Sequence, residues 1–344
     1  MCSPQGTLLG ATAGTFPFVH RQSHFDLLAC RYLERILERP LDAAKRPKLY
    51  LSIIAALSLL AFIPAQAQHG SAKAQAAPAK SPSVEDKLAE SYHNMYDLKF
   101  QEAFKAADEA VALGQDDPLP SIAQAWVAFF RELDRLHALR SEVFTTDDGF
   151  NSRDSYAWDP ADKKIFDSGL DRAEKLAQAR LARNPNDTRA LLALSLSNGL
   201  HGDDIGMFTK KDLKALSYIK TATEYSERTL AQAPDSYDAY VATGMGKYII
   251  GRKSAPVRWV LRMGGYKGDE QEGIRELALA ADHARYLAPF ARILVAFEDV
   301  RKNDPASARH KLEELHQQFP NNPLFQEELG KLDHTSARLT RQGN

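Results

Sequence analysis

Apolar and polar positions alternate with a helical period along most of the chain after Val84. In the clearest stretch the apolar side chains recur every three or four residues, which places them on one face of a long helix. These side chains are Ile122, Ala125, Trp126, Phe129, Phe130, Leu133 and Leu136, and the spacing recurs at Phe290, Ile293, Leu294 and Phe297. No stretch alternates strictly enough, with β-branched side chains, to predict a strand. The pattern therefore predicts an all-α protein.

Prolines separate the predicted helices. Proline is tolerated in the first turn of a helix but breaks its interior, so prolines mark the turns. The separating residues are Pro118, Pro185, Pro234, Pro289, Pro305, Pro320 and Pro323. We expect about ten helices over residues 84–335, forming one elongated stack, and a flexible tail at 336–344.

Two segments of the chain, 173–194 and 222–243, match each other at an offset of 49 residues. Each contains a small alanine in a first helix and a proline in the turn before a second helix. The matched residues are Ala173 with Ala222 and Pro185 with Pro234, and Ala308 with Pro320 forms a third copy. Alanines at these places let two helices approach closely, and the proline starts the next helix.

This pattern resembles the tetratricopeptide repeat, a pair of helices of about 34 residues. The longer offset found here implies longer helices or insertions. The resemblance implies an α-α superhelix, a solenoid whose concave surface binds a protein or peptide. It also implies an alternative, since some periplasmic members accompany solute transporters and hold a ligand in a cavity through the stack. Trp126, Phe129 and Phe130 would line such a cavity.

The segment 45–67 has the three parts of a secretory signal. Basic residues precede an apolar run over 49–63, and Ala65-Gln66-Ala67 predicts cleavage after Ala67. The run is shorter than the roughly 20 residues that span a bilayer. We therefore expect an exported, periplasmic protein, and the alternative is an uncleaved inner-membrane anchor that leaves the protein facing the periplasm.

The regions on either side of this signal are also unusual. We interpret residues 1–44 as an N-terminal extension that arises from a misassigned translation start. Residues 68–83 consist mainly of Ala, Pro, Ser, Lys and Gln, which predicts a disordered linker. Cys2 and Cys30 are the two cysteines of the chain and both precede the predicted cleavage site, so neither a disulfide scaffold nor a cysteine-rich metal site is expected.

The charges nearly balance, with 44 Lys and Arg against 45 Asp and Glu. This balance argues against a nucleic-acid partner, which would be bound by neutralising phosphates. One segment, 251–268, has basic residues and no acid. Ser254 and Pro256 predict the start of a short helix there. The candidate partner-binding residues of the segment are Arg252, Lys253, Arg258, Trp259, Arg262 and Lys267.

Such a cationic amphipathic helix is suited to an acidic partner or to peripheral contact with anionic lipid. The alternative is a packing helix with snorkelling arginines. A second candidate surface is the predicted loop at 145–160, with Phe150, Tyr156 and Trp158 as partner anchors. In the alternative interpretation these rings only fasten the loop to the helices.

The sequence lacks the motifs of common enzymes and metal sites, including HExxH, GxSxG and GxxxxGK[ST]. His201, Asp203 and Asp204 could form a ligand cluster, but we favour a solvated turn whose acids start the next helix. We therefore predict no catalytic residue, no cofactor and no metal. The leading hypothesis is a binding or assembly scaffold for a protein or peptide. The alternatives are a ligand-holding accessory subunit of an envelope transporter and a membrane-anchored envelope protein.

Overall fold

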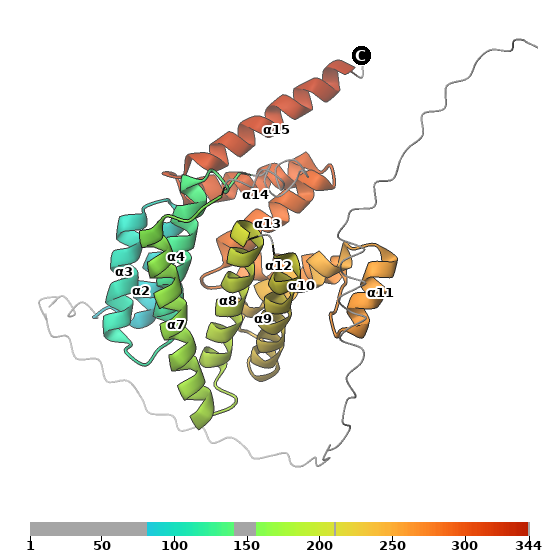
Figure 1. Cartoon of the computed structure of the whole chain (residues 1–344). Helices are drawn as coiled ribbons and strands as arrows, with labels where there is room; N and C mark the ends of the chain where they lie inside the picture. The colour runs from blue at the N-terminus through green and yellow to red at the C-terminus, as the bar shows by residue number, and fades with distance from the viewer. Residues whose placement is uncertain (1–80, 141–155, 210, 343–344) are drawn as a thin grey trace, which may run out of the picture. The chain divides into compact units, whose positions relative to one another are not determined.

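The computed structural model describes residues 81–140, 156–209 and 211–342 (Figure 1). Several predictions fall outside the described residues. They concern the extension at 1–44, the signal at 45–67, residues 68–80 of the linker, and Phe150. In the described part of the chain the regular structure consists of twelve α-helices and one π-helical turn, without strands. The prediction of an all-α fold is confirmed.

The helices follow one another with short connections. They are α2 (Val84–Tyr96), α3 (Phe100–Leu113), α4 (Leu119–Arg135), α7 (Pro160–Arg183), α8 (Thr188–Asp204), α9 (Asp212–Gln232), α10 (Ala239–Gly251), α11 (Ala255–Met263), α12 (Glu270–His283), α13 (Ala288–Arg301), α14 (Pro305–Gln318) and α15 (Pro323–Gln342). The π-helical turn η2 (Ile205–Thr209) continues α8 directly. The last helix, α15, extends beyond residue 335, where the predicted helical domain ends.

Helix starts are fixed by side chains that satisfy the free backbone N–H groups of the first turn. Ser83 and Asp86 form a reciprocal capping box at the start of α2. Aspartates accept backbone N–H groups at the starts of α7, α8, α12 and α14, and each such cap is worth about 1 kcal/mol. Prolines are the first residues of α7, α14 and α15, as the sequence predicted for Pro305 and Pro323.

The two segments related by the 49-residue offset are the helix pairs α7–α8 and α9–α10. The motif alanines are buried in the first helix of each pair, and α14 and α15 repeat the arrangement. The motif prolines lie in the turns before the second helix begins, so the expectation that they start that helix was wrong. These residues are Ala173, Ala222, Ala308, Pro185, Pro234 and Pro320. Consecutive helices pack against each other along most of the chain. The arrangement is that of an α-α superhelix.

The end of α2 meets the turn between α14 and α15. The carboxylate of Asp97 accepts hydrogen bonds from the backbone N–H of Asn321 at 2.9 Å and from its Nδ2 at 2.7 Å. The ring centroids of Tyr96 and Phe319 are 5.5 Å apart. An elongated stack, in which each repeat contacts only its neighbours, does not make these contacts, so that expectation was wrong. Tyr96 and Phe319 are fully buried where the two ends meet.

Two glycines set the close approach of α10 and α12. A Cβ on Gly273 would lie 2.6 Å from the backbone nitrogen of Tyr248 and 2.7 Å from the carbonyl oxygen of Gly244. Any side chain would therefore force the two helices apart. The contact positions α10 so that Met245 reaches the interior of the helical array.

The short helix α11 packs on a small apolar cluster separate from the main core. Leu261 and Val257 face Leu216 and Ile250. The prediction of a short helix in 251–268 is confirmed. In the described part of the chain, no helix combines the length and apolarity needed to cross a bilayer.

Candidate ligand-binding cavity

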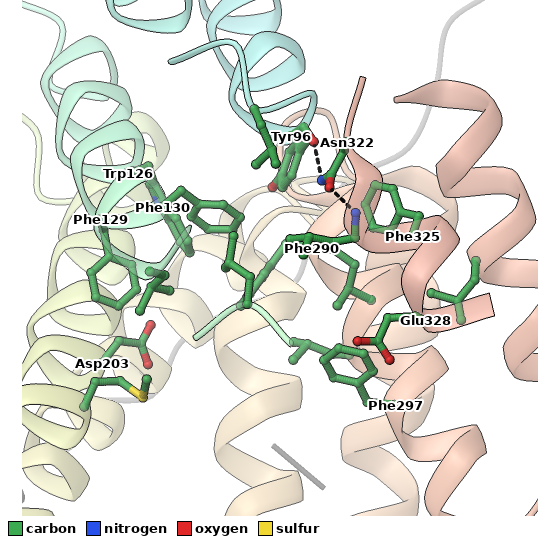
Figure 2. Close-up of a pocket in the computed structure, with 18 of the residues that line it drawn as sticks. Tyr96, Trp126, Phe129, Phe130, Asp203, Phe290, Phe297, Asn322, Phe325 and Glu328 are labelled. Carbon is green, nitrogen blue, oxygen red and sulfur yellow. Dashed lines mark hydrogen bonds between the residues drawn. The ribbon is translucent and has the colours of Figure 1, made fainter. Parts of the chain in front are cut away.

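Between the helices lies a cavity of about 150 Å³. Its wall is built from α4, α8 and η2, α10, α13, α14 and α15, together with the end of α2 (Figure 2). Most of the wall is apolar and rich in aromatic rings. The aromatic lining residues are Tyr96, Trp126, Phe129, Phe130, Phe290, Phe297 and Phe325. A concave, mainly aromatic site with few polar groups is the usual form of a small-molecule site.

The helical spacing of α4 places three of these rings on the wall. Trp126, Phe129 and Phe130 lie three and four residues apart, so they share one face of the helix. Trp126 contacts Phe290 of α13 edge to face, with 5.4 Å between ring centroids, and Phe130 at 5.5 Å. These contacts hold the rings in fixed orientations. All three rings line the cavity, and the ligand-holding function stays a prediction.

Asp203 is the polar group that stands out on the wall. Its side chain is only partly exposed and lines the cavity beside the apolar residues. No hydrogen bond or ion pair among the described residues involves its carboxylate. Burial, followed by the negative charge of the neighbouring Asp204, raises the pKa of Asp203 to about 7. The carboxyl group is therefore poised to gain or lose a proton near neutral pH, or to meet a ligand group.

Local helix geometry places Asp203 inside and turns Asp204 away. Asp203 and Met207 are four residues apart where α8 passes into the π-helical turn, and both line the cavity. π-helical turns occur frequently at functional sites. Asp204 instead accepts a hydrogen bond from Trp158 Nε1 at 2.7 Å and lies 3.7 Å from Lys163 Nζ. Neighbouring acids thus have different surroundings.

Two further polar groups mark the cavity wall. The indole N–H of Trp126 is buried and has no hydrogen-bond acceptor in the described part of the chain. Glu328 lies across the cavity from Asp203 in Figure 2, and its Oε1 is 2.6 Å from Lys331 Nζ. A buried donor without an acceptor costs about 1–3 kcal/mol, and a ligand atom in the cavity would recover part of that cost.

The expectation of a solvated turn at His201 was wrong. His201 and Asp203 belong to the last turn of α8, which continues without a break into η2. His201 Nε2 lies 3.0 Å from Glu174 Oε1 of α7. The imidazole is therefore partnered with Glu174 and not with the two aspartates. No group of three or more metal-ligating side chains occurs among the described residues.

The loop aromatics within the described residues, Tyr156 and Trp158, pack on the helices. Trp158 stacks on Phe208 with 4.7 Å between ring centroids and contacts Phe166 at 5.0 Å. The Trp158 indole also donates to Asp204, as described above. These contacts fasten the segment to α7 and η2, while partner binding by this pair stays a prediction.

Several basic side chains of 251–268 have partners within the chain. Lys267 pairs with Glu227 at 2.7 Å, Arg258 donates to the carbonyl of Gly251 at 2.9 Å, and Arg252 lies 3.9 Å from Glu298. Lys253 is half-buried, and Arg262 is exposed on the same side of α11 as Arg258. The cationic character expected from the sequence is thus reduced by neighbouring acids that lie far away in the sequence.

The apolar face of α11 is the more distinctive feature. Trp259 is 63% exposed and Met263 is 48% exposed. They account for two of the three large, exposed apolar side chains of the described residues, the third being Leu113. Both lie on the side of α11 opposite Leu261, the residue that packs inward.

Comparison of the sequence with protein-family models and with curated proteins gives no match. The residue of the candidate site that sequence reasoning missed is Asp203, which was considered only as part of a surface cluster. The one sequence feature that pointed toward the cavity was the aromatic face at 126–130. Nothing in the sequence pairs that face with an aspartate 73 residues further along the chain.

Proposed function

We propose that this protein is a ligand-binding protein that holds a small, largely apolar molecule in the cavity beside Trp126 and Asp203. The observation that supports this most directly is an aromatic-lined cavity whose wall includes polar groups without partners. Fully packed cores avoid both features. A ligand would fill the void and give these groups a partner.

Ligand binding in the cavity would also stabilise the fold. A ligand that binds only the folded state adds stability by mass action, and the gain rises with the logarithm of its concentration relative to its dissociation constant. Stabilisation by an added ligand is therefore a direct readout of the proposal.

The resemblance of the repeats to tetratricopeptide proteins suggests the setting. We propose that the exported chain holds its ligand in the periplasm as an accessory subunit of an envelope transporter. The signal predicted from the sequence at 45–67 is the basis for proposing export, and the contact between the two ends of the helical array favours carriage over an extended scaffold.

A cavity-filling substitution tests the proposal. In Met245→Trp the larger side chain would occupy the space now lined by Met245. Met263→Trp is the matched control, because Met263 lies on the exposed face of α11. The chain purified under native conditions is analysed for bound small molecules by mass spectrometry, with thermal unfolding measured for each variant.

We expect a bound molecule in the wild type and in Met263→Trp, and its loss from Met245→Trp with the helical circular dichroism unchanged. The same variant should also lose stabilisation by added small apolar molecules. If the wild type neither carries nor is stabilised by any such molecule, or if both variants bind equally well, the proposed function is wrong.

A second candidate function rests on a different observation, the exposed Trp259. Aromatic side chains are enriched at the centres of interfaces, and Trp259 and Met263 together offer an apolar contact flanked by Arg262. We propose that α11 is the contact for a protein partner. Replacement of Trp259 by alanine would then weaken that contact without changing the cavity.

A further inference from the structure

The charges that face the cavity are all negative. Asp203 and Glu328 are the ionisable carboxyl groups of its wall, and no Lys, Arg or His of the described residues lines it. Glu328 is paired with Lys331, and Asp204 turns toward Trp158 and Lys163. Asp203 is therefore the one lining carboxylate that makes no ion pair or hydrogen bond within the described part of the chain. A positively charged group in the cavity would supply the partner it lacks.

The aromatic wall favours the same charge. Figure 2 shows Phe129 next to Asp203, with Trp126 and Phe130 above them on α4. The face of an aromatic ring carries the negative end of its quadrupole, so it attracts a cation and repels an anion. A carboxylate or phosphate in this cavity would meet acidic groups and aromatic rings, with no basic side chain among the described lining residues to balance it.

The size of the cavity limits the molecule. A cavity of about 150 Å³ is comparable to the engineered apolar cavity that accepts benzene. The apolar part of the ligand is therefore about as large as one six-membered ring with a short side chain.

We propose that the cavity ligand is a small apolar amine whose ammonium group binds Asp203 and whose hydrocarbon part packs against Trp126 and Phe129. This inference rests on the proposed ligand-binding function and specifies the chemical class of the ligand. Because burial raises the pKa of the Asp203 carboxyl to about 7, the protein itself compensates its negative charge poorly, and an ammonium ion would supply the missing compensation.

Three probes of nearly equal size and different charge separate this inference from the proposed function. They are 2-phenylethylamine, 2-phenylethanol and phenylacetate, and their binding to the purified chain at neutral pH is measured by isothermal titration calorimetry. We expect the amine to bind at least about tenfold more tightly than the alcohol, because a hydrogen bond to a charged group is stronger than a neutral one. The carboxylate should bind most weakly.

Asp203→Asn should remove the preference for the amine, lowering its affinity about tenfold and leaving that of the alcohol within twofold. Asp282→Asn, at an exposed aspartate, is the matched control and should keep the wild-type order. Far-UV circular dichroism confirms that each variant is folded, and the comparison of the three probes on the wild type does not depend on any variant.

Equal binding of amine and alcohol, or tighter binding of phenylacetate, would overturn the amine assignment while leaving the ligand-binding function intact. An amine preference that survives in Asp203→Asn would overturn the role of Asp203. Failure of all three probes to bind would contradict both the inference and the proposed function.

Discussion

Asp203→Asn offers a direct test of the electrostatics of the cavity in the absence of any ligand. The Asp203 carboxyl lacks a hydrogen-bond donor or cation among the described residues, and the negative charge of Asp204 on the same helix adds to the effect of burial on its pKa. Lys163 of α7 faces Asp204 at 3.7 Å, and Glu328 of α15 is on the cavity wall. Asparagine has nearly the same shape as aspartate but cannot ionise, so the substitution isolates the effect of the charge.

The magnitude follows from the raised pKa. The folded chain holds the proton of Asp203 up to about pH 7, whereas the unfolded chain releases it near the ordinary value of 3.8. The contribution of Asp203 to the free energy of unfolding is therefore greatest at low pH. It falls as pH rises from 3.8 to about 7 and is constant above about pH 7. At roughly 1.4 kcal/mol per pKa unit, the full decline is about 4 kcal/mol.

The assay is urea unfolding of wild type and variant, followed by far-UV circular dichroism from about pH 4.5 to about pH 8. The difference between the two chains cancels every other titrating group that the substitution leaves unchanged. We expect Asp203→Asn to gain about 3 kcal/mol of stability relative to the wild type across this window, because part of the full decline lies below about pH 4.5. The exposed control Asp282→Asn should show no such trend.

A difference between Asp203→Asn and wild type that stays constant with pH would refute the reasoning. It would mean that water or an unrecognised partner solvates the carboxylate in the folded chain as well as bulk water does. A difference of opposite sign, with the wild type gaining relative stability as pH rises, would mean that the cavity stabilises the charged form, which is the reverse of the argument from burial.

Three further predictions concern the framework around the cavity. Gly273→Ala should destabilise the fold by about 1–3 kcal/mol through overlap with α10, whereas Gly199→Ala, with open space around its Cβ, should stabilise it by up to about 1 kcal/mol; thermal unfolding compares them. Asp97→Ala should cost about 2–3 kcal/mol in urea unfolding at neutral pH. Burial opposes ionisation of Asp97, but hydrogen bonds from Lys99 and Asn321 outweigh it and lower its pKa, so this loss should shrink as acid protonates the carboxyl. Trp259→Ala should abolish capture of the α11 partner from envelope extract with unchanged unfolding, and undiminished capture would exclude this face.

The sequence predicted local structure well because local structure depends on near neighbours in the chain. The apolar spacing at 122–136 predicts the inner face of α4, and the prolines at 305 and 323 mark two helix starts. Helix caps and proline sterics act within a few residues. The 49-residue match likewise reflects two similar helix pairs, each stabilised by a buried alanine.

The candidate site was predicted only in part. The ring face of Trp126, Phe129 and Phe130 was recognisable as apolar and aromatic, but its cavity also needs side chains from α8, α10, α13, α14 and α15. The environment of Asp203 was misread as solvent, because an aspartate in an ambiguous stretch of glycines and acids resembles a turn. Its burial depends on helices that are far away in the sequence.

The sequence by itself determined that this chain is helical, where its helices turn, and which faces are apolar, because these properties follow from spacing, capping and proline geometry over a few residues. Only the tertiary structure decided that the stack closes through Asp97 and Asn321, that α11 keeps Trp259 exposed, and that Asp203 joins the rings around a cavity. Those outcomes depend on contacts between distant residues, whose partners no local pattern specifies. The raised pKa of Asp203 likewise depends on its burial by side chains from several helices.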